Sequence, residues 1–423
     1  MNLKSTTFLF LILFLVLPTN VLANGITEIG SISEEGAIAI QNAFDASGIP
    51  SIQAAIIINN ALVWAKGYGE QPALNTVFRT GSVTKTFTAA AFVKLNETGI
   101  INLDDDVSDY LPFQVRNPNE PGTIITIRMV LEHKAGMKIY HQFNQPWISA
   151  EMLQLLDDLN YTISIPVPSW NGIRLPLQDI INSTNINDPD LWLPTTGDFA
   201  YSNTGYFFLS FLLEHITNNT WSDYIHDTIL TPLGMNETKF NVTEYAQPVA
   251  VPHLKLDNGT LVALPVYRDY GYGAGGLMTT VTDLSKFIIA VTNGGWYGDV
   301  QIFQPEYVPI MNQYLQQYGS MLGYSAEFGK FTTECGKLGA VLFTNWDMGN
   351  MALIWSALLT EGQSLLSQYC PEATTTTPTT STTTSPTATT TNPPPPDILL
   401  ISGLSIGGAV VVIAFLLVLK RRK

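Results

Sequence analysis

The sequence has little charge and almost no cysteine. Only 13% of its 423 residues are charged, against about 25% in a typical soluble domain, and 35 acidic residues outnumber 20 basic ones. This excess of acids argues against binding to nucleic acid, which needs a basic surface. Two cysteines exclude a disulfide-rich scaffold and most structural zinc sites. The five histidines include no His-Glu-x-x-His pair, so we expect no metal or other cofactor. With 46% apolar residues, the chain is too hydrophobic to be mainly disordered.

The two ends of the chain carry the longest apolar runs. Residues 1–23 combine one basic residue, an apolar stretch and small residues before the cleavage position, which indicates a secretory signal peptide. Residues 398–419 are uncharged and long enough, as a helix, to cross a bilayer core of about 30 Å. Four basic residues, 420–423, follow and favour the cytoplasm. We therefore predict a single-pass type I membrane protein whose bulk is extracellular or luminal, with the cell surface favoured.

Between these ends the composition changes once. Residues 24–370 are predicted to form the extracellular domain, and the Thr/Ser/Pro-rich residues 371–397 a mucin-like stalk or a bare linker. In the anchor, Gly403 and Gly407 form a Gly-x-x-x-Gly face that would allow a weak homodimer. The number of N-glycosylation sequons suits a secreted glycoprotein. Their asparagines are Asn96, Asn160, Asn182, Asn218, Asn236, Asn241 and Asn258.

The hydrophobic pattern predicts an α/β domain of the α+β sandwich type. Residues 33–46 have helical spacing, and residues 52–58 and 62–68 are short apolar runs around an Asn-Asn turn. Near the other end, residues 339–345 predict a buried strand and residues 349–367 a closing helix. We expect an antiparallel sheet from both chain ends, flanked by helices, with an inserted and mostly helical subdomain. Cys335 and Cys370 either form a disulfide or remain two free thiols.

The segment around Ser82 has the features of an activated nucleophile. Ser82-Val83-Thr84-Lys85 leads into the apolar residues 87–95, which predicts a buried helix with the serine on its first turn. Backbone N–H groups at that end favour an oxyanion. Lys85, one turn above Ser82, would take the hydroxyl proton if burial keeps its amine neutral. The alternative is a serine cap beside a solvated lysine.

A second element, Tyr201-Ser202-Asn203, precedes the apolar residues 204–216. A phenolate beside an ammonium can shuttle protons, and the amide of Asn203 can bind a substrate carbonyl. The alternative is a loop tyrosine at the start of a helix.

In this order the two elements resemble the serine β-lactamase and penicillin-binding-protein family, nearest its class C-like branch with a Tyr-x-Asn motif. Residues 99–106, 131–136 and 274–277 are similar to further segments of that family. The resemblance implies a β-lactamase/transpeptidase-like fold and an acyl-enzyme on Ser82. It also implies that Lys85 and Tyr201 exchange protons and that Asn203 positions the substrate.

The third motif of that family departs from its usual form. It normally places Lys or His two residues before a Gly on the strand that borders the site, and here the matching residues are Gln317 and Gly319. Without that cation a substrate carboxylate loses a charge-assisted contact. A backbone N–H near Gly319 would still complete an oxyanion hole.

We therefore expect a membrane-anchored extracellular serine hydrolase that acts on an ester, amide or peptide carbonyl. The alternative is a catalytically inactive domain of the same fold, used as a cell-surface binding or adhesion module.

Overall fold

The computed structural model describes most of the chain up to Cys370, namely residues 25–138, 150–161, 181, 186–240, 248–267, 272–346 and 351–370. The chain divides into two units, Met1–Cys370 and Pro371–Lys423, and all described residues lie in the first. The predicted signal peptide, stalk, anchor and tail, with Gly403 and Gly407, lie outside the described residues and stay predictions. Within the described ranges, no helix is long and apolar enough to cross a bilayer.

A six-stranded antiparallel sheet forms the centre of the first unit. Its strand order is β1-β3-β2-β12-β11-β10, and every neighbouring pair is antiparallel. Three strands come from the N-terminal part of the chain and three from the C-terminal part, so the predicted sheet from both chain ends is confirmed. The bounds are β1 Glu28–Gly30, β2 Ser51–Ile58, β3 Ala61–Gly69, β10 Tyr318–Met321, β11 Tyr324–Thr333 and β12 Gly336–Thr344.

The predicted turn at the two asparagines joins β2 to β3, and asparagine suits the backbone conformation there. Asn59 and Asn60 have φ of 48° and 66°, and asparagine tolerates this left-handed conformation better than most residues. Asn59 also bonds to Lys337, because its N–H donates to the Lys337 carbonyl and its Oδ1 accepts from the Lys337 N–H, each at 2.9 Å. These bonds hold Lys337 beside the turn, and pairing with β11 extends β12 to Gly336, ahead of the predicted start at residue 339.

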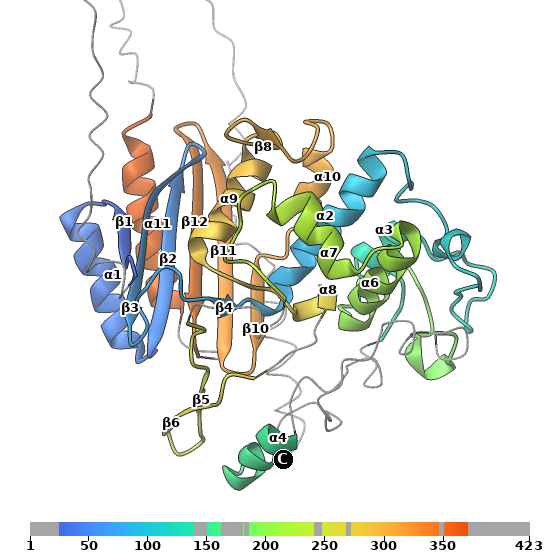
Figure 1. Cartoon of the computed structure of the whole chain (residues 1–423), viewed down its shortest axis with the longest axis horizontal. Helices are drawn as coiled ribbons and strands as arrows, with labels where there is room; N and C mark the ends of the chain where they lie inside the picture. The colour runs from blue at the N-terminus through green and yellow to red at the C-terminus, as the bar shows by residue number, and fades with distance from the viewer. Residues whose placement is uncertain are drawn as a thin grey trace, which may run out of the picture. The chain divides into compact units, whose positions relative to one another are not determined.

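Helices α1 (Glu34–Ser47) and α11 (Ala352–Ser367) cover one face of this sheet (Figure 1). The side chain of Ser33 caps α1 by accepting from the Gly36 N–H. Glu361 of α11 accepts from both the N–H and the hydroxyl of Ser33, each at 2.8 Å. The start of α1 is thereby fixed to α11. Both helices match the predicted ones, although α11 begins at Ala352 rather than at 349.

The other face of the sheet packs against the inserted helical part of the chain (Figure 1). Its main helices are α2 (Thr84–Glu97), α6 (Asn203–Thr217) and α9 (Val281–Thr292). Phe87 of α2 packs against Phe287 of α9 with ring centroids 4.7 Å apart. The shorter elements are β4 Phe78–Arg79, η1 Gly81–Val83, η2 Val107–Tyr110, α3 Ile127–Leu131, α4 Ala150–Asp158, η3 Pro189–Leu191, α7 Trp221–Ile225, η4 His226–Leu230, β5 His253–Lys255, β6 Leu261–Ala263, α8 Tyr272–Gly275, β7 Met278–Thr279, β8 Trp296–Tyr297, β9 Val300–Gln301 and α10 Val308–Gln313.

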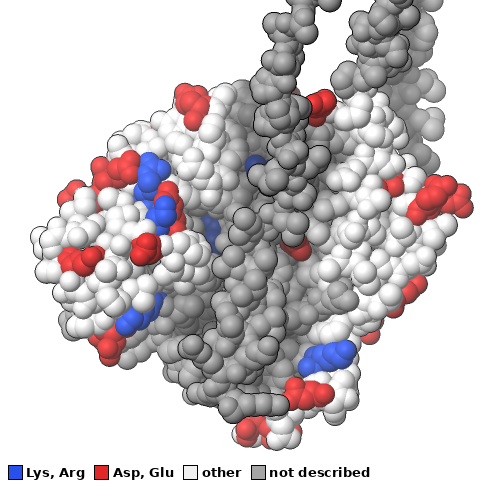
Figure 2. Space-filling view, turned by 180° about the vertical axis from the view of Figure 1, so that it is seen from behind, with Lys and Arg blue, Asp and Glu red and all other residues white. Residues whose placement is uncertain are grey.

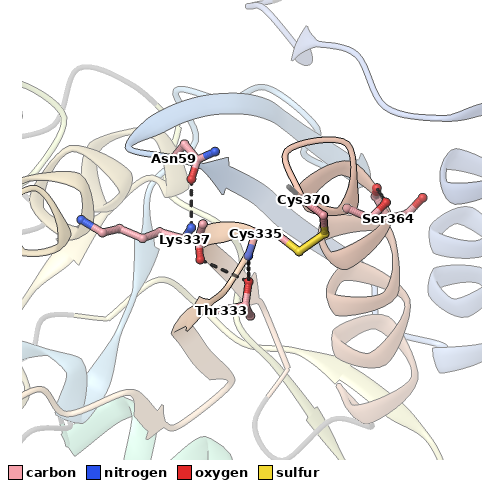
Figure 3. Close-up of a disulfide and its surroundings, with 8 residues drawn as sticks. Asn59, Thr333, Cys335, Lys337, Ser364 and Cys370 are labelled. Carbon is pink, nitrogen blue, oxygen red and sulfur yellow. Dashed lines mark hydrogen bonds between the residues drawn. A yellow bond between two sulfur atoms is a disulfide. The ribbon is translucent and has the colours of Figure 1, made fainter. Parts of the chain in front are cut away.

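A disulfide joins Cys335 to Cys370 (Figure 3). Cys335 lies in the turn between β11 and β12, where its N–H donates to the Thr333 hydroxyl at 3.2 Å. Cys370 follows the end of α11 by one short turn. The bond therefore ties the end of the last helix to a turn of the central sheet, and it settles the question that the sequence left open.

Several basic side chains on the surface lie beside acidic ones. Arg128 binds Asp104 at 2.7 Å and Arg116 binds Asp106 at 2.5 Å. The face drawn in Figure 2 shows acidic groups spread widely, and several of the basic groups lie next to them. The excess of acids found in the composition is thus distributed over that face.

Candidate active site

Ser82 lies in a tight turn that leads directly into a buried helix. The turn is η1, with Gly81 at φ 51° and the Thr84 hydroxyl donating to the Gly81 carbonyl at 2.6 Å. Helix α2 starts at Thr84, so Ser82 precedes the helix instead of lying on its first turn as expected. Residues 84–93 of α2 are all buried, which fixes the turn relative to the core.

Three of the predicted residues meet at this turn. The Ser82 hydroxyl oxygen lies 2.6 Å from the Tyr201 phenol oxygen and 2.9 Å from the Lys85 amine nitrogen. Both distances are within hydrogen-bond range. The serine therefore has a possible proton acceptor and a possible proton donor in direct contact, although Tyr201 is 119 residues away in sequence.

Burial makes the amine of Lys85 suitable as a base. The side chain is fully buried, and desolvation lowers the pKa of Lys85 well below its usual value. Its nitrogen donates to the Ala274 carbonyl of α8 at 2.6 Å and lies 5.1 Å and 5.6 Å from the ring centres of Tyr201 and Tyr206. The carbonyl bond orients the amine, and the neutral amine keeps a lone pair for the proton of Ser82.

Tyr201 is a phenol at neutral pH, not the phenolate considered from the sequence. Burial raises the pKa of Tyr201 to about 12, although the hydrogen bond with Ser82 acts in the opposite direction. Because burial favours the neutral amine and the protonated phenol, Lys85 is suited to accept a proton and Tyr201 to donate one.

Asn203 is the first residue of α6, and Ser202 caps that helix through its hydroxyl. The side-chain oxygen of Asn203 is buried and has no hydrogen-bond partner among the described residues. A buried amide oxygen without a partner is costly, and a ligand N–H would satisfy it. This geometry suits the predicted role of Asn203 in binding substrate.

Strand β10 borders the Ser82 turn at the edge of the sheet. A β-carbon on Gly319 would lie 2.0 Å from the Thr80 carbonyl oxygen and 2.7 Å from the Ser82 nitrogen, and one on Gly81 would lie 2.8 Å from the Ser320 nitrogen. Two facing glycines therefore allow β10 and η1 to touch through their backbones.

The register of β10 decides which N–H groups face this turn. The Phe328 N–H donates to the Gln317 carbonyl at 2.9 Å, so the hydrogen-bonded pairs of the β10–β11 ladder are those at 317, 319 and 321. The N–H of Gly319 consequently points toward β11, and that of Ser320 points toward η1. The backbone donor expected near Gly319 thus belongs to Ser320, the next residue.

Gln317 is exposed immediately before β10. Because side chains alternate along a strand, Gln317 shares the face of Gly319, toward Ser82. A literal Lys-x-Gly sequence begins at Lys337, but it lies on β12, which β11 separates from β10. The position that would hold the cation of the third motif is therefore occupied by a neutral amide.

Sequence reasoning gave no role to His133 or Ala274, although both lie in segments that carry the resemblance. The Nδ1 atom of His133 accepts from the Ser202 N–H at 3.1 Å, and its ring centre lies 4.6 Å from that of Tyr201. These two contacts of His133 could not be predicted from a local pattern, because each depends on the path of the loop that carries Tyr201 and Ser202. In the described part of the chain, no cluster of three or more His, Cys, Asp or Glu side chains could hold a metal ion.

Known proteins share this domain. Protein flp of Staphylococcus aureus (strain NCTC 8325 / PS 47) is 27% identical over 248 residues, which cover 57% of this chain and 45% of flp. A putative D-alanyl-D-alanine carboxypeptidase of Escherichia coli (strain K12) is 25% identical over 300 residues, covering 62% of this chain and 64% of that protein. The chain thus matches about half to two thirds of the length of these relatives.

A solved structure supports the fold independently. The D-amino acid amidase of Ochrobactrum anthropi SV3 superimposes with a TM-score of 0.58 at 17% identity, over 79% of this chain and 99% of the amidase. At this identity the likeness shows the fold alone, which is the predicted β-lactamase/transpeptidase-like one. Residues 38–306, more than half of the chain, match the family model described as Beta-lactamase. The chain therefore belongs to the β-lactamase family, whose fold is that of serine hydrolases.

Proposed function

We propose that this protein is a membrane-anchored extracellular serine hydrolase that cleaves an ester or amide through an acyl-enzyme on Ser82. One observation carries the proposal: the hydroxyl of Ser82 contacts both the Lys85 amine and the Tyr201 phenol, at 2.9 Å and 2.6 Å. A structural serine has no need of a buried amine and a buried phenol on the same oxygen.

In the first half-reaction the Ser82 oxygen attacks the substrate carbonyl carbon, and the Ser82 proton passes to the Lys85 amine. The carbonyl oxygen becomes an oxyanion, for which the backbone N–H groups of Ser82 and Ser320 are the donors. The leaving alkoxide or amine takes a proton from Tyr201, which recovers one from Lys85. The products are the acyl ester of Ser82 and the free alcohol or amine.

In the second half-reaction a water molecule attacks the acyl ester. Lys85, neutral again, takes the proton of this water, and the second oxyanion forms in the same backbone site. Its collapse expels the Ser82 oxygen, which is protonated through Tyr201. The carboxylic acid leaves, and both proton-transfer groups return to their starting states.

The substrate is inferred from the neutral residue at Gln317. A carboxylate next to the scissile bond would gain no charge-assisted contact there, so esters or amides without that group are favoured. The names of two similar proteins, a carboxypeptidase and an amidase, fit hydrolysis of amide bonds. Because the chain matches only part of its curated relatives, their substrates do not transfer directly.

The extracellular location is inferred from the sequence of both ends. The surface agrees with it, because four of the five described sequon asparagines are exposed: Asn160, Asn218, Asn236 and Asn258. Attached sugar would therefore not disturb the core at these four positions. Peptide mapping of the protein from a secretory cell, before and after removal of N-linked sugar, tests this part.

A labelling experiment tests the catalytic part. We expect a fluorophosphonate to add its mass to Ser82, and Ser82→Ala to abolish the labelling. Ser364→Ala, an exposed serine on α11, is the matched control and should label like the wild type. If a folded protein labels with neither a fluorophosphonate nor a penicillin, the hydrolase is rejected in favour of the inactive binding module.

A further inference from the structure

His133 has an unusual backbone at the end of α3. Its φ is 57°, in the left-handed region that often ends a helix and that histidine adopts more readily than most residues other than glycine. Neighbouring segments hold it there: the His133 N–H donates to the Val130 carbonyl at 3.1 Å, and the His133 carbonyl accepts from the Ala200 N–H at 2.8 Å. These two bonds fix the backbone from which the His133 ring projects.

The ring of His133 packs against the phenol of the candidate site. Its centre lies 4.6 Å from the ring of Tyr201 and 5.1 Å from that of Tyr206, with interplanar angles of 34° and 38°. The exposed ring of Phe199 meets it edge-on at 5.8 Å. Tyr201 is thus supported on one side by an aromatic wall, while its oxygen contacts Ser82.

The same ring also fixes the backbone that carries Asn203. Its Nδ1 accepts from the Ser202 N–H at 3.1 Å, so a neutral ring carries its proton on Nε2. Ser202 is the cap of α6, and Asn203 follows it as the first helical residue. One side chain therefore contacts both the tyrosine and the segment that presents the asparagine.

The surroundings favour the neutral ring. Burial lowers the pKa of His133 to about 3, and the positive charge of Lys85 in its protonated form acts in the same direction, against the smaller opposite effect of the Ser202 bond. The titratable groups around it are Lys85 of α2, Tyr201 and Tyr206. A protonated ring would lose its acceptor atom and place a positive charge near the buried Lys85 amine.

From these contacts we propose that His133 is a positioning residue of the site: its ring orients Tyr201, and its Nδ1 fixes the Ser202–Asn203 backbone. The proposal rests on the proposed hydrolase function. It does not make His133 a catalytic residue, because no contact joins it to Ser82 or to the Lys85 amine.

Two substitutions separate the two contacts. His133→Asn tolerates the left-handed φ and offers an oxygen near the place of Nδ1, but it removes the ring. His133→Phe keeps a ring and removes the acceptor. For His133→Asn we expect the acylation rate with a nitrophenyl ester to fall about 10- to 100-fold, because a displaced catalytic group loses its aligned geometry, with little change in KM.

A double-mutant cycle distinguishes positioning from a purely structural role. In a Tyr201→Phe background the phenol oxygen is absent, so His133→Asn should change the single-turnover acylation rate by less than about 2-fold. An equal loss in both backgrounds would overturn the proposal, because it would show that His133 does not act through Tyr201.

A crystallographic readout keeps the proposal separate from catalysis. In His133→Asn the Tyr201 oxygen should move out of hydrogen-bond range of Ser82. If this distance stays at its wild-type value, His133 does not position Tyr201, whether or not the protein is an enzyme. If the wild type proves inactive while the displacement occurs, the hydrolase fails and the positioning contact stands.

Discussion

Gly319 passes so close to Thr80 that a β-carbon at position 319 would lie 2.0 Å from the Thr80 carbonyl oxygen. The atom that such a side chain would strike belongs to the backbone, so no rotation of a flexible side chain relieves the overlap. The close spacing between β10 and the Ser82 turn therefore requires a residue without a side chain at position 319. The distance between the two backbone donors, at Ser82 and Ser320, depends on the same requirement.

We predict that Gly319→Ala lowers kcat by about 100-fold or more, because widening this spacing removes one oxyanion donor. The measurement is steady-state hydrolysis of a neutral ester. Gly122→Ala is the control, since a β-carbon there meets no atom within 4 Å and φ is not positive. Unchanged kcat in a folded Gly319→Ala protein would show that β10 takes no part in the reaction.

Lys85→Arg should lower kcat/KM by about 10²- to 10⁴-fold, because arginine stays protonated and cannot accept the Ser82 proton. Activity requires the neutral amine, which is present above its pKa. Since that pKa is well below the usual lysine value, the wild-type rate should rise with pH and level off well below pH 10. Lys94→Arg on the same helix, whose nitrogen bonds the Ile302 carbonyl, should retain activity. A pH–rate profile of both variants and the wild type checks this.

Glu327→Gln should stabilise the protein at neutral and alkaline pH but not at acidic pH. Glu327 lies on β11 between Tyr318 and Leu342, and burial raises the pKa of Glu327 to about 7. A raised carboxyl pKa favours folding at low pH, and this contribution is lost as pH rises from about 4.5 through 7. Because Glu327 is partly exposed, we expect the substitution to raise the free energy of unfolding by only about 1 kcal/mol at pH 8, and not at all at pH 4.

Thermal unfolding of Glu327→Gln at these two pH values gives the result directly. Glu334→Gln, an exposed residue in the turn between β11 and β12, serves as the matched control. Equal shifts at both pH values would mean that the carboxyl charge does not oppose folding.

Replacing both Cys335 and Cys370 by serine should lower the free energy of unfolding by about 4 kcal/mol, because the bond closes a loop across a sequence separation of 35. Urea unfolding of both proteins, with and without a reducing agent, measures this. The reducing agent should lower the wild-type midpoint and leave that of the double variant in place. A midpoint that does not respond in either protein contradicts the prediction.

The elements that could be predicted have strong local signals. Ser33 indicates the start of α1, because its side chain accepts from an N–H of the first turn. Asn59 and Asn60 indicate the hairpin, because both adopt the left-handed φ that its turn requires. Ser82 and Lys85 lie one turn apart in any helix-like segment, so their contact followed from the spacing. The approach of Tyr201 depended on a resemblance to a family rather than on physics.

The remaining features depend on contacts between distant parts of the chain. Lys85 bonds Ala274 across 189 residues, and its pKa follows from burial that no local pattern specifies. The N–H that faces the Ser82 turn belongs to Ser320 rather than to Gly319 only because of the register with β11, which a shift of one residue would reverse. The place of His133 beside Tyr201 depends likewise on a distant contact, because the His133 carbonyl accepts from the Ala200 N–H.

The disulfide has a mechanical consequence. A pulling force applied through the residues that follow Cys370 would enter the domain at that cysteine and pass at once through the sulfur–sulfur link to Cys335, at the tip of two central strands (Figure 3). The last helix is bypassed, so tension would not unwind it from its end. In a domain tethered at this point, the first load would be carried by the central sheet.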